Sequence, residues 1–379
     1  MRHEITEARC GRIIERSNIC VSGIARDRAA YDSCSCGRSD VRHLDKRWYS
    51  KNPATDHTAT LLPDGQVLVS GGENATGVLA GAELYNPSTG QWMVTGSMTS
   101  PRIGHKATLL QNGEVLVSGG NNASGALASA ELYNVSTGQW KSTGSMTIPR
   151  TSHGATLLNN GKVLVAGGNN SVGSPGNTTE LYDPTSGTWK ATGSMQTFRM
   201  FTLTLLQDGR ALAVDDSGTV NQSGEIYDPS TGQWTLTAEM YYAHSGDAVA
   251  LLPNGNVLAY GYHLACYAGQ FFNPSTNTWS RTNGQCGTGI SFGPLALLGT
   301  GKVLLGGGFI IYSGKSSSTA HADLYDPSTN NWAATGTLNQ ARSAHTLVRL
   351  LNGQALAAGG FTKNSTGTVF LTSAELYTP

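Results

Sequence analysis

One stretch of the chain, His105 to Trp140, recurs in altered form along most of the sequence and constrains the fold more than any single residue. Two of its apolar runs, Ala107–Leu110 and Val115–Val117, flank Asn112-Gly113, a dipeptide typical of a tight β-hairpin. A third run, Leu132-Tyr133, leads through a turn rich in Asn, Ser, Thr and Gly to Trp140. The unit therefore predicts four short strands, a to d in chain order, in one meandering antiparallel sheet.

The copies of this unit share residues at fixed places. Strand b ends in two glycines in five copies: Gly71-Gly72, Gly119-Gly120, Gly167-Gly168, Gly307-Gly308 and Gly359-Gly360. Strand c carries Glu-Leu-Tyr or a close variant. Strand d carries a tryptophan in six copies: Trp92, Trp140, Trp189, Trp234, Trp279 and Trp332. A chain of such sheets cannot bury both faces of each sheet unless neighbouring sheets stack.

With its repeat period near 50 residues, its double glycine and its paired Tyr and Trp, the chain resembles the kelch-repeat proteins, with a more distant similarity to the propeller domain of the galactose-oxidase-like enzymes. The resemblance implies an all-β, seven-bladed β-propeller with four antiparallel strands per blade, and it covers about residues 56–379. Large Tyr and Trp rings are then expected between the blades.

Seven sets of strands a, b and c are present, but only six complete strands d follow them. We expect Lys46–Lys51 to supply the missing outer strand and close the last blade, with Trp48 as the counterpart of Trp92. The propeller would then span residues 46–379. Residues 1–45, which hold four of the six cysteines, are expected to form a poorly ordered tail or to follow from a misplaced start.

The order of the strands sorts the connections onto two faces. The a–b hairpins and the c–d turns share one face, which we call the short-turn face. The longer b–c loops and the d–a connections share the other, the long-loop face, and this is the predicted binding face. His57, His105, His153, His244 and His345 begin strand a, and Arg102, Arg150, Arg199 and Arg342 recur before it. The histidines could form a metal-binding ring, but we interpret both sets as repeated scaffold contacts.

The repeat breaks down in units four to six. Asp215-Asp216 replaces the double glycine of unit four, and Gly261-Tyr262-His263 replaces that of unit five. The residues of the candidate binding rim are Asp215, Asp216, Tyr241, Tyr242, Tyr262, His263 and Tyr267. The alternative is that these departures are drift in a degenerate repeat.

Two cysteines, Cys266 and Cys286, lie in the same part of the repeat region. Cys266 is expected in the b–c loop of unit five and Cys286 in the connection to unit six, so both emerge on the long-loop face. We predict a disulfide between them, the alternative being two unpaired, buried thiols.

The leading functional prediction is a non-catalytic binding or scaffolding module for a protein or glycan partner, with no cofactor. The alternative is a copper radical oxidase like galactose oxidase or another carbohydrate-active enzyme, for which Tyr242, Tyr262, His263 and Cys266 would supply the residue types. Against it, the adjacent Tyr-His pair of that family belongs to strand a. Copper would be the cofactor only under this alternative.

Composition limits the other partners. The formal net charge is +0, which gives no electrostatic attraction to nucleic acid, and no apolar run is long enough for a membrane span. We expect a monomer. The compartment stays open. The predicted disulfide favours an extracellular location, whereas the Asn-x-Ser/Thr sites are about as frequent as chance predicts and no apolar stretch after Met1 indicates a secretory signal.

Overall fold

The computed structural model of the chain describes residues 48–49, 54–169, 176–197, 201–215, 223–241, 245–263, 266–283, 290–291, 293–312, 315–365 and 367–379. The chain divides into two compact units, Met1–Val41 and Arg42–Pro379, and every described residue belongs to the second. The predicted tail, residues 1–45, lies outside the described residues. Among the described residues no helix is long and apolar enough to cross a membrane.

Seven four-stranded antiparallel sheets make up the second unit, and we number them as blades 1 to 7 along the chain. The strands of the first three blades are β2 (Thr58–Leu61), β3 (Val67–Ser70), β6 (Ala82–Asn86) and β7 (Gln91–Val94); β8 (Lys106–Leu109), β9 (Val115–Ser118), β12 (Ala130–Asn134) and β13 (Gln139–Thr143); and β14 (Gly154–Leu157), β15 (Val163–Ala166), β16 (Thr179–Asp183) and β17 (Thr188–Ala191). Each blade follows the predicted order a, b, c, d.

The other four blades complete the set. Their strands are β18 (Phe201–Leu205), β19 (Ala211–Asp215), β20 (Ser223–Asp228) and β21 (Gln233–Glu239); β22 (Ser245–Leu251), β23 (Val257–His263), β24 (Cys266–Asn273) and β25 (Thr278–Arg281); β27 (Leu295–Leu297), β28 (Val303–Gly306), β31 (Ala322–Asp326) and β32 (Asn331–Ala334); and β33 (Thr346–Arg349), β34 (Ala355–Ala358), β37 (Ser373–Tyr377) and β1 (Trp48–Tyr49). The fold is the predicted seven-bladed kelch-type propeller.

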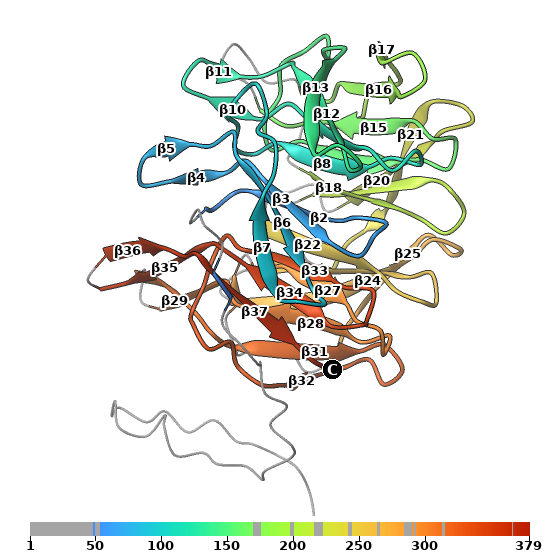
Figure 1. The fold of residues 1–379 in the computed structure, drawn as a ribbon. Helices are drawn as coiled ribbons and strands as arrows, with labels where there is room; N and C mark the ends of the chain where they lie inside the picture. Colours follow the sequence, from blue (N-terminus) through green and yellow to red (C-terminus); the bar gives the residue numbers. More distant parts are fainter. Residues whose placement is uncertain are drawn as a thin grey trace, which may run out of the picture. The chain divides into compact units, whose positions relative to one another are not determined.

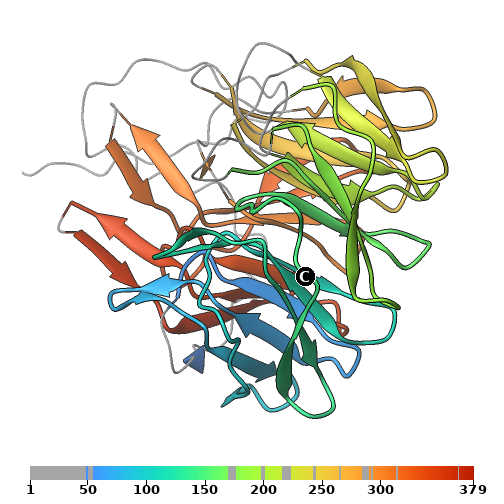
Figure 2. The same cartoon turned by 90° about the horizontal axis from the view of Figure 1, so that it is seen from above.

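The innermost strands form a closed cycle. Strand a of each blade contacts strand a of the next, in the order β2, β8, β14, β18, β22, β27, β33 and back to β2. The glycines of the a–b turns make a second cycle, because each lies against the preceding blade. At the point where the ring closes, an ideal Cβ on Gly65 would be 3.2 Å from Cδ1 of Leu351 in blade 7. Figures 1 and 2 show the blades following one another in sequence colour.

The N-terminal strand closes the last blade, as predicted. In blade 7, β1 pairs antiparallel with β37, Trp48 opposite Ala374 and Tyr49 opposite Ser373. The register corrects one expectation, however. Ala374 corresponds to Ala82 of blade 1, so Trp48 lies where Thr95 follows β7 and is not the counterpart of Trp92, which pairs with Tyr85. The short link from Trp48 to His57 explains the shift, because it leaves too few residues for the usual register.

Aromatic side chains fill the space between blades. Tyr133 and Trp140 of blade 2 pack with ring centroids 5.0 Å apart. The Tyr133 hydroxyl lies 2.8 Å from Oγ1 of Thr95 in blade 1, and Nε1 of Trp140 donates to the carbonyl of Gly96 at 2.8 Å. The same Tyr–Trp packing recurs in blades 1, 3, 4 and 6, with Phe272 replacing Tyr in blade 5. These contacts bury large apolar rings, and several of their hydroxyl and indole N–H groups form hydrogen bonds across a junction.

Several b–c connections on the long-loop face are small hairpins. They are β4 (Glu73–Asn74) with β5 (Gly77–Val78), β10 (Asn121–Asn122) with β11 (Gly125–Ala126), β29 (Phe309–Tyr312) with β30 (Lys315–Ser318), and β35 (Phe361–Asn364) with β36 (Gly367–Phe370). In addition β26 (Ile290–Ser291), from the d–a connection before blade 6, pairs with β29. Figure 1 shows β4–β5, β10–β11 and β35–β36 on the left of the view.

Candidate functional site

The double glycine and the recurrent histidine form one packing unit across each regular blade junction. Gly71 has φ +66° and Gly72 has φ +91°. An ideal Cβ on Gly71 would be 2.6 Å from Cε1 of His105 and 2.7 Å from the carbonyl oxygen of Arg102. Any side chain at this place would overlap the histidine ring of the next blade. The same relation joins Gly119 to His153, Gly307 to His345 and Gly359 to His57.

The histidines of the regular junctions are buried and bridge neighbouring blades. Nε2 of His57 lies 3.0 Å from Thr346, that of His105 lies 3.0 Å from Thr58, and that of His153 lies 3.1 Å from Ser118. Burial lowers the pKa of His57 to about 4 and that of His105 to about 3, so both rings are neutral near pH 7. Within the described ranges no group of three or more His, Cys, Asp or Glu side chains could hold a metal ion.

The recurrent arginine and the strand-c glutamate form buried ion pairs. Arg102 binds Glu131 at 2.7 Å, and its other guanidinium nitrogen donates to the carbonyl of Gly119 at 2.7 Å. Arg150 with Glu180 and Arg342 with Glu375 repeat the arrangement at 2.9 and 2.6 Å. Each glutamate also accepts backbone N–H groups of the d–a connection. These residues are scaffold, as the sequence indicated, and they join strand c to the d–a connection at the base of the long-loop face.

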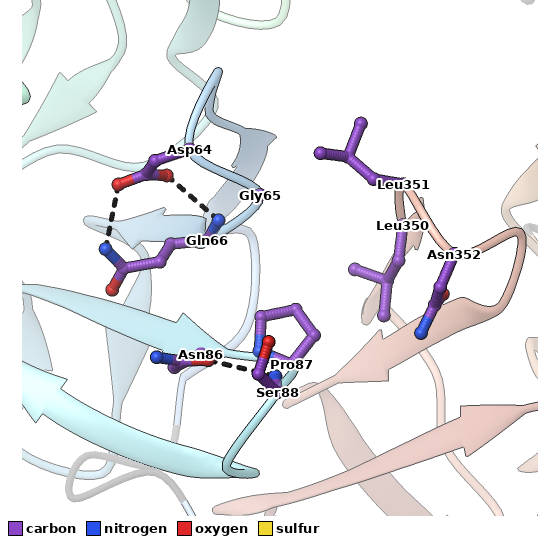
Figure 3. Close-up of a pocket in the computed structure, with 9 residues that line it drawn as sticks. All are labelled: Asp64, Gly65, Gln66, Asn86, Pro87, Ser88, Leu350, Leu351 and Asn352. Carbon is purple, nitrogen blue, oxygen red and sulfur yellow. Dashed lines mark hydrogen bonds between the residues drawn. The ribbon is translucent and has the colours of Figure 1, made fainter.

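The short-turn face has grooves of its own, but they follow the repeat. Figure 3 shows the groove between blades 7 and 1, lined by Asp64, Asn86 and Leu351 among others. The side chain of Asp64 is already engaged by Gln66 of the same turn, at 2.8 Å. Equivalent grooves lie at the junctions of blades 2 and 3 and of blades 3 and 4. They mark the turns of the regular repeat and not a special site.

Three consecutive junctions depart from the regular packing unit. At the end of strand b of blade 4, Asp215 holds the place of Gly71, with its backbone opposite Phe201. Phe201 in turn holds the place of the histidine that begins strand a. Asp216 follows Asp215 and lies outside the described residues.

Blade 5 differs most. Its strand a has a bulge between Ser245 and Ala248, and Ala248 is paired as Thr58 is in blade 1. Asp247, directly before Ala248, therefore holds the place of the recurrent histidine. His244, which the sequence pattern placed there, lies outside the described residues. At the junction of blades 1 and 2, Gly71 and His105 are in contact. At the junction of blades 4 and 5, Asp215 takes the place of the glycine and Asp247 takes the place of the histidine. The sequence interpretation missed Asp247 because the bulge displaced it from the histidine count.

The aromatic residues predicted for blade 5 lie on two long strands, β23 and β24. Tyr262 pairs with Tyr267, and His263 pairs with Cys266, each across the same hairpin. Cys266 therefore begins strand c and does not lie in a loop. Cys286 and Tyr242 lie outside the described residues, so the disulfide stays a prediction.

Tyr241 is the one predicted rim residue whose side chain is described. Its backbone N–H donates to Oε1 of Gln270 at 3.0 Å, the role that strand-c glutamates have in other blades. Tyr241 is 51% exposed, and the guanidinium carbon of Arg281 lies 4.7 Å from the centroid of its ring. Gln270 itself is fully buried. A neutral amide at this place avoids a buried carboxylate where the pattern has no arginine.

Blade 6 completes the departing sector. Gly293 holds the place of the histidine, and an ideal Cβ on it would be 2.8 Å from the carbonyl oxygen of Gly307 and from Cδ1 of Leu305. Ile290, three residues earlier, replaces the arginine and is fully buried. We call the long-loop surface over blades 4, 5 and 6 the irregular sector.

The comparisons with known proteins agree with this architecture. The model of the Kelch motif matches residues 104–147 and 149–196. Among solved structures, the chain is similar to a "novel fungal alcohol oxidase with catalytic diversity among the AA5 family, in complex with copper", at 16% identity and a TM-score of 0.71, over 90% of this chain and 77% of the other. No curated protein matches the chain. The chain is a kelch-type propeller, and its likeness to the alcohol oxidase concerns the fold alone.

The residue types considered for copper can be compared with this arrangement. Tyr262, His263 and Cys266 lie on β23 and β24, in strands b and c, whereas the family's adjacent Tyr-His pair belongs to strand a. Tyr242 lies outside the described residues. The side chains of Tyr262, His263 and Cys266 also lie outside those that the structure describes, so the copper oxidase stays an alternative.

Proposed function

We propose that the propeller is a binding module that recognises a protein or glycan partner through the irregular sector of the long-loop face. The kelch-type propeller commonly serves binding, and its connections on one face vary while the blades stay constant. The observation that carries the proposal is the clustering of the departures. They occupy three neighbouring junctions, whereas the junctions from blade 6 to 7, 7 to 1, 1 to 2 and 2 to 3 keep the glycine–histidine contact.

The chemistry of the irregular sector supports recognition of a polar partner. An exposed aromatic ring with a guanidinium beside it, as at Tyr241 and Arg281, offers apolar area and hydrogen-bond donors together. Asp215 and Asp247 add carboxylates at positions where the regular repeat has none. Carboxylates and tyrosines suit sugar hydroxyls and also suit basic or polar protein surfaces.

The test compares variants of the full chain against a glycan array and against affinity capture from the native source. Two variants change the irregular sector: the single variant Tyr241→Ala, and the double variant Asp215→Gly with Tyr262→Gly, which restores glycines of the repeat. Each should weaken binding at least about tenfold with unchanged thermal stability. Val369→Ala is the matched control, because Val369 is 58% exposed on the same face but in blade 7. Unchanged affinity in the sector variants would show that the departures are drift. Copper-dependent peroxide production by the purified chain would favour the oxidase alternative.

A further inference from the structure

In blade 6 a histidine replaces the arginine of the buried ion pair. The strand-c carboxylate there is Asp323, and the arginine place is taken by Ile290. His321, two residues before Asp323, lies with Nε2 3.1 Å from Oδ1 of Asp323. In blades 2, 3 and 7 the residue at the place of His321 is Ser129, Thr178 or Ser373, each a hydroxyl that the arginine contacts.

The pair has one buried and one accessible member. The side chain of Asp323 is 6% exposed and that of His321 is 30% exposed. Oδ2 of Asp323 is buried and has no hydrogen-bond partner among the described residues. A buried carboxylate is costly unless it is paired with a cation. In blade 6 the partner of this carboxylate is His321. Unlike arginine, a histidine can gain or lose its charge near neutral pH.

The segment that carries His321 holds the long-loop edge of blade 6 to the connection that leads to blade 7. Thr319 donates its N–H to the carbonyl of Gly308 and accepts the N–H of Arg342, and His321 accepts the N–H of Gly307. The segment thus ties the glycines of blade 6 to the scaffold arginine of blade 7. The side chains of Asp323 and of its partner His321 lie on the opposite side of the strand, toward blade 5, because Ala322 packs against blade 7 and Tyr325 packs against blade 5.

We infer that the His321–Asp323 pair makes the long-loop edge of blade 6, on the side that faces blade 5, a pH-sensitive joint, locked by the imidazolium and loosened when His321 loses its proton. This inference does not depend on the proposed binding function.

The charges around His321 support this behaviour. The Asp323 carboxylate raises the pKa of His321 above its usual range, against the effect of partial burial. On the side that faces blade 5, the buried Ile290 holds the arginine place, and residues 284–289 lie outside those that the structure describes. On the opposite side of the strand, Arg342 is held by Glu375 at 2.6 Å, and burial lowers the pKa of His345 well below its usual range. The side chain of Lys315, at the start of β30, lies outside those that the structure describes.

The pH dependence follows from the direction of this shift. Because the folded-state pKa of His321 lies above the unfolded value of about 6.5, the pair stabilises the fold fully below that pH. The stabilisation disappears as the pH rises through the folded-state pKa. The buried histidines of the regular junctions change the stability in the opposite direction as the pH rises. The contribution of His321 must therefore be measured as the difference in unfolding free energy between the wild type and a His321 variant at the same pH.

The experiment uses the full chain and three variants. NMR titration should give His321 a pKa above about 6.5, and Asp323→Asn should lower it to that value or below. Urea unfolding should show a stability difference between the wild type and His321→Gln that is largest near pH 6 and shrinks as the pH rises through the His321 titration. His321→Arg, which keeps a permanent charge, should not show this decline.

Two results would overturn the inference. One is a His321 pKa at or below about 6.5 in the wild type, which can be measured even where a variant fails to fold. The other is a difference between wild type and His321→Gln that stays constant across the pH range.

Discussion

The ring of His105 lies against Gly71 of the preceding blade so closely that an ideal Cβ on Gly71 would be 2.6 Å from Cε1 of the imidazole. This contact joins strand a of one blade to strand b of the one before, and four of the blade junctions repeat it. It explains why the second strand of the repeat ends in glycine. It also defines the background against which Asp215, Asp247 and Gly293 are exceptions.

Replacing Gly71 should test this contact. Gly71→Ala should cost about 2–3 kcal/mol of unfolding free energy, because the new methyl group meets His105 and φ is +66°. Gly81→Ala is the matched control, since nothing lies within 4 Å of an ideal Cβ there. Urea denaturation measures both. Equal stability of the two variants would contradict the packing role.

Breaking a buried ion pair should be far more damaging than breaking an exposed one. Arg150→Gln leaves the buried Glu180 carboxylate without its arginine partner, so we expect the unfolding free energy to fall by about 3–5 kcal/mol. Lys162→Gln removes the exposed pair with Asp183 and should leave the unfolding free energy nearly unchanged, because solvent screens this pair. A small effect of Arg150→Gln would show that the pair is dispensable.

Acid should destabilise the propeller through its buried histidines. His57 and His105 have folded-state pKa values of about 4 and about 3, below the unfolded value, so the unfolded chain binds more protons as the pH falls. Their stabilising contribution is complete above about pH 6.5 and falls by up to about 1.4 kcal/mol per histidine for each pH unit below it. Unfolding curves from pH 7 to pH 5 measure the slope, and His105→Gln should reduce it. If His105→Gln left the slope unchanged, protonation of His105 would not be a cause of the acid sensitivity.

The N-terminal strand should be essential to closure. Deleting residues 1–44 should leave the melting temperature nearly unchanged, whereas deleting residues 1–52 removes β1 and its pairing with Ser373 and Ala374. The second truncation should melt well below the first. At this junction the Tyr85 hydroxyl and Nε1 of Trp92 have no hydrogen-bond partner among the described residues. Equal melting of both truncations would argue against closure by β1.

The sequence was sufficient for the fold because the repeat supplies its own alignment. Counterparts of Gly71, His105 and Trp92 recur in most of the copies, and this pattern predicted the number of blades, the order of strands and the two faces. It was wrong about Trp48, because the residue type matched Trp92 while the length of the following link set a different register. It missed Asp247, because a bulge in β22 is not visible in residue counts. The pairing of His321 with Asp323 also required the structure, since a missing arginine alone does not show what replaces it.

The central claim, that the irregular sector is the binding surface, can be tested by mapping a bound partner. Hydrogen exchange of the full chain should be measured with and without the strongest binder from the array or the capture experiment. We predict slowed exchange at β22, β23 and β24 and around Tyr241, with the hairpins β4–β5 and β10–β11 unchanged. Protection confined to the short-turn face, at Asp64–Gln66 and its equivalents, would contradict the account.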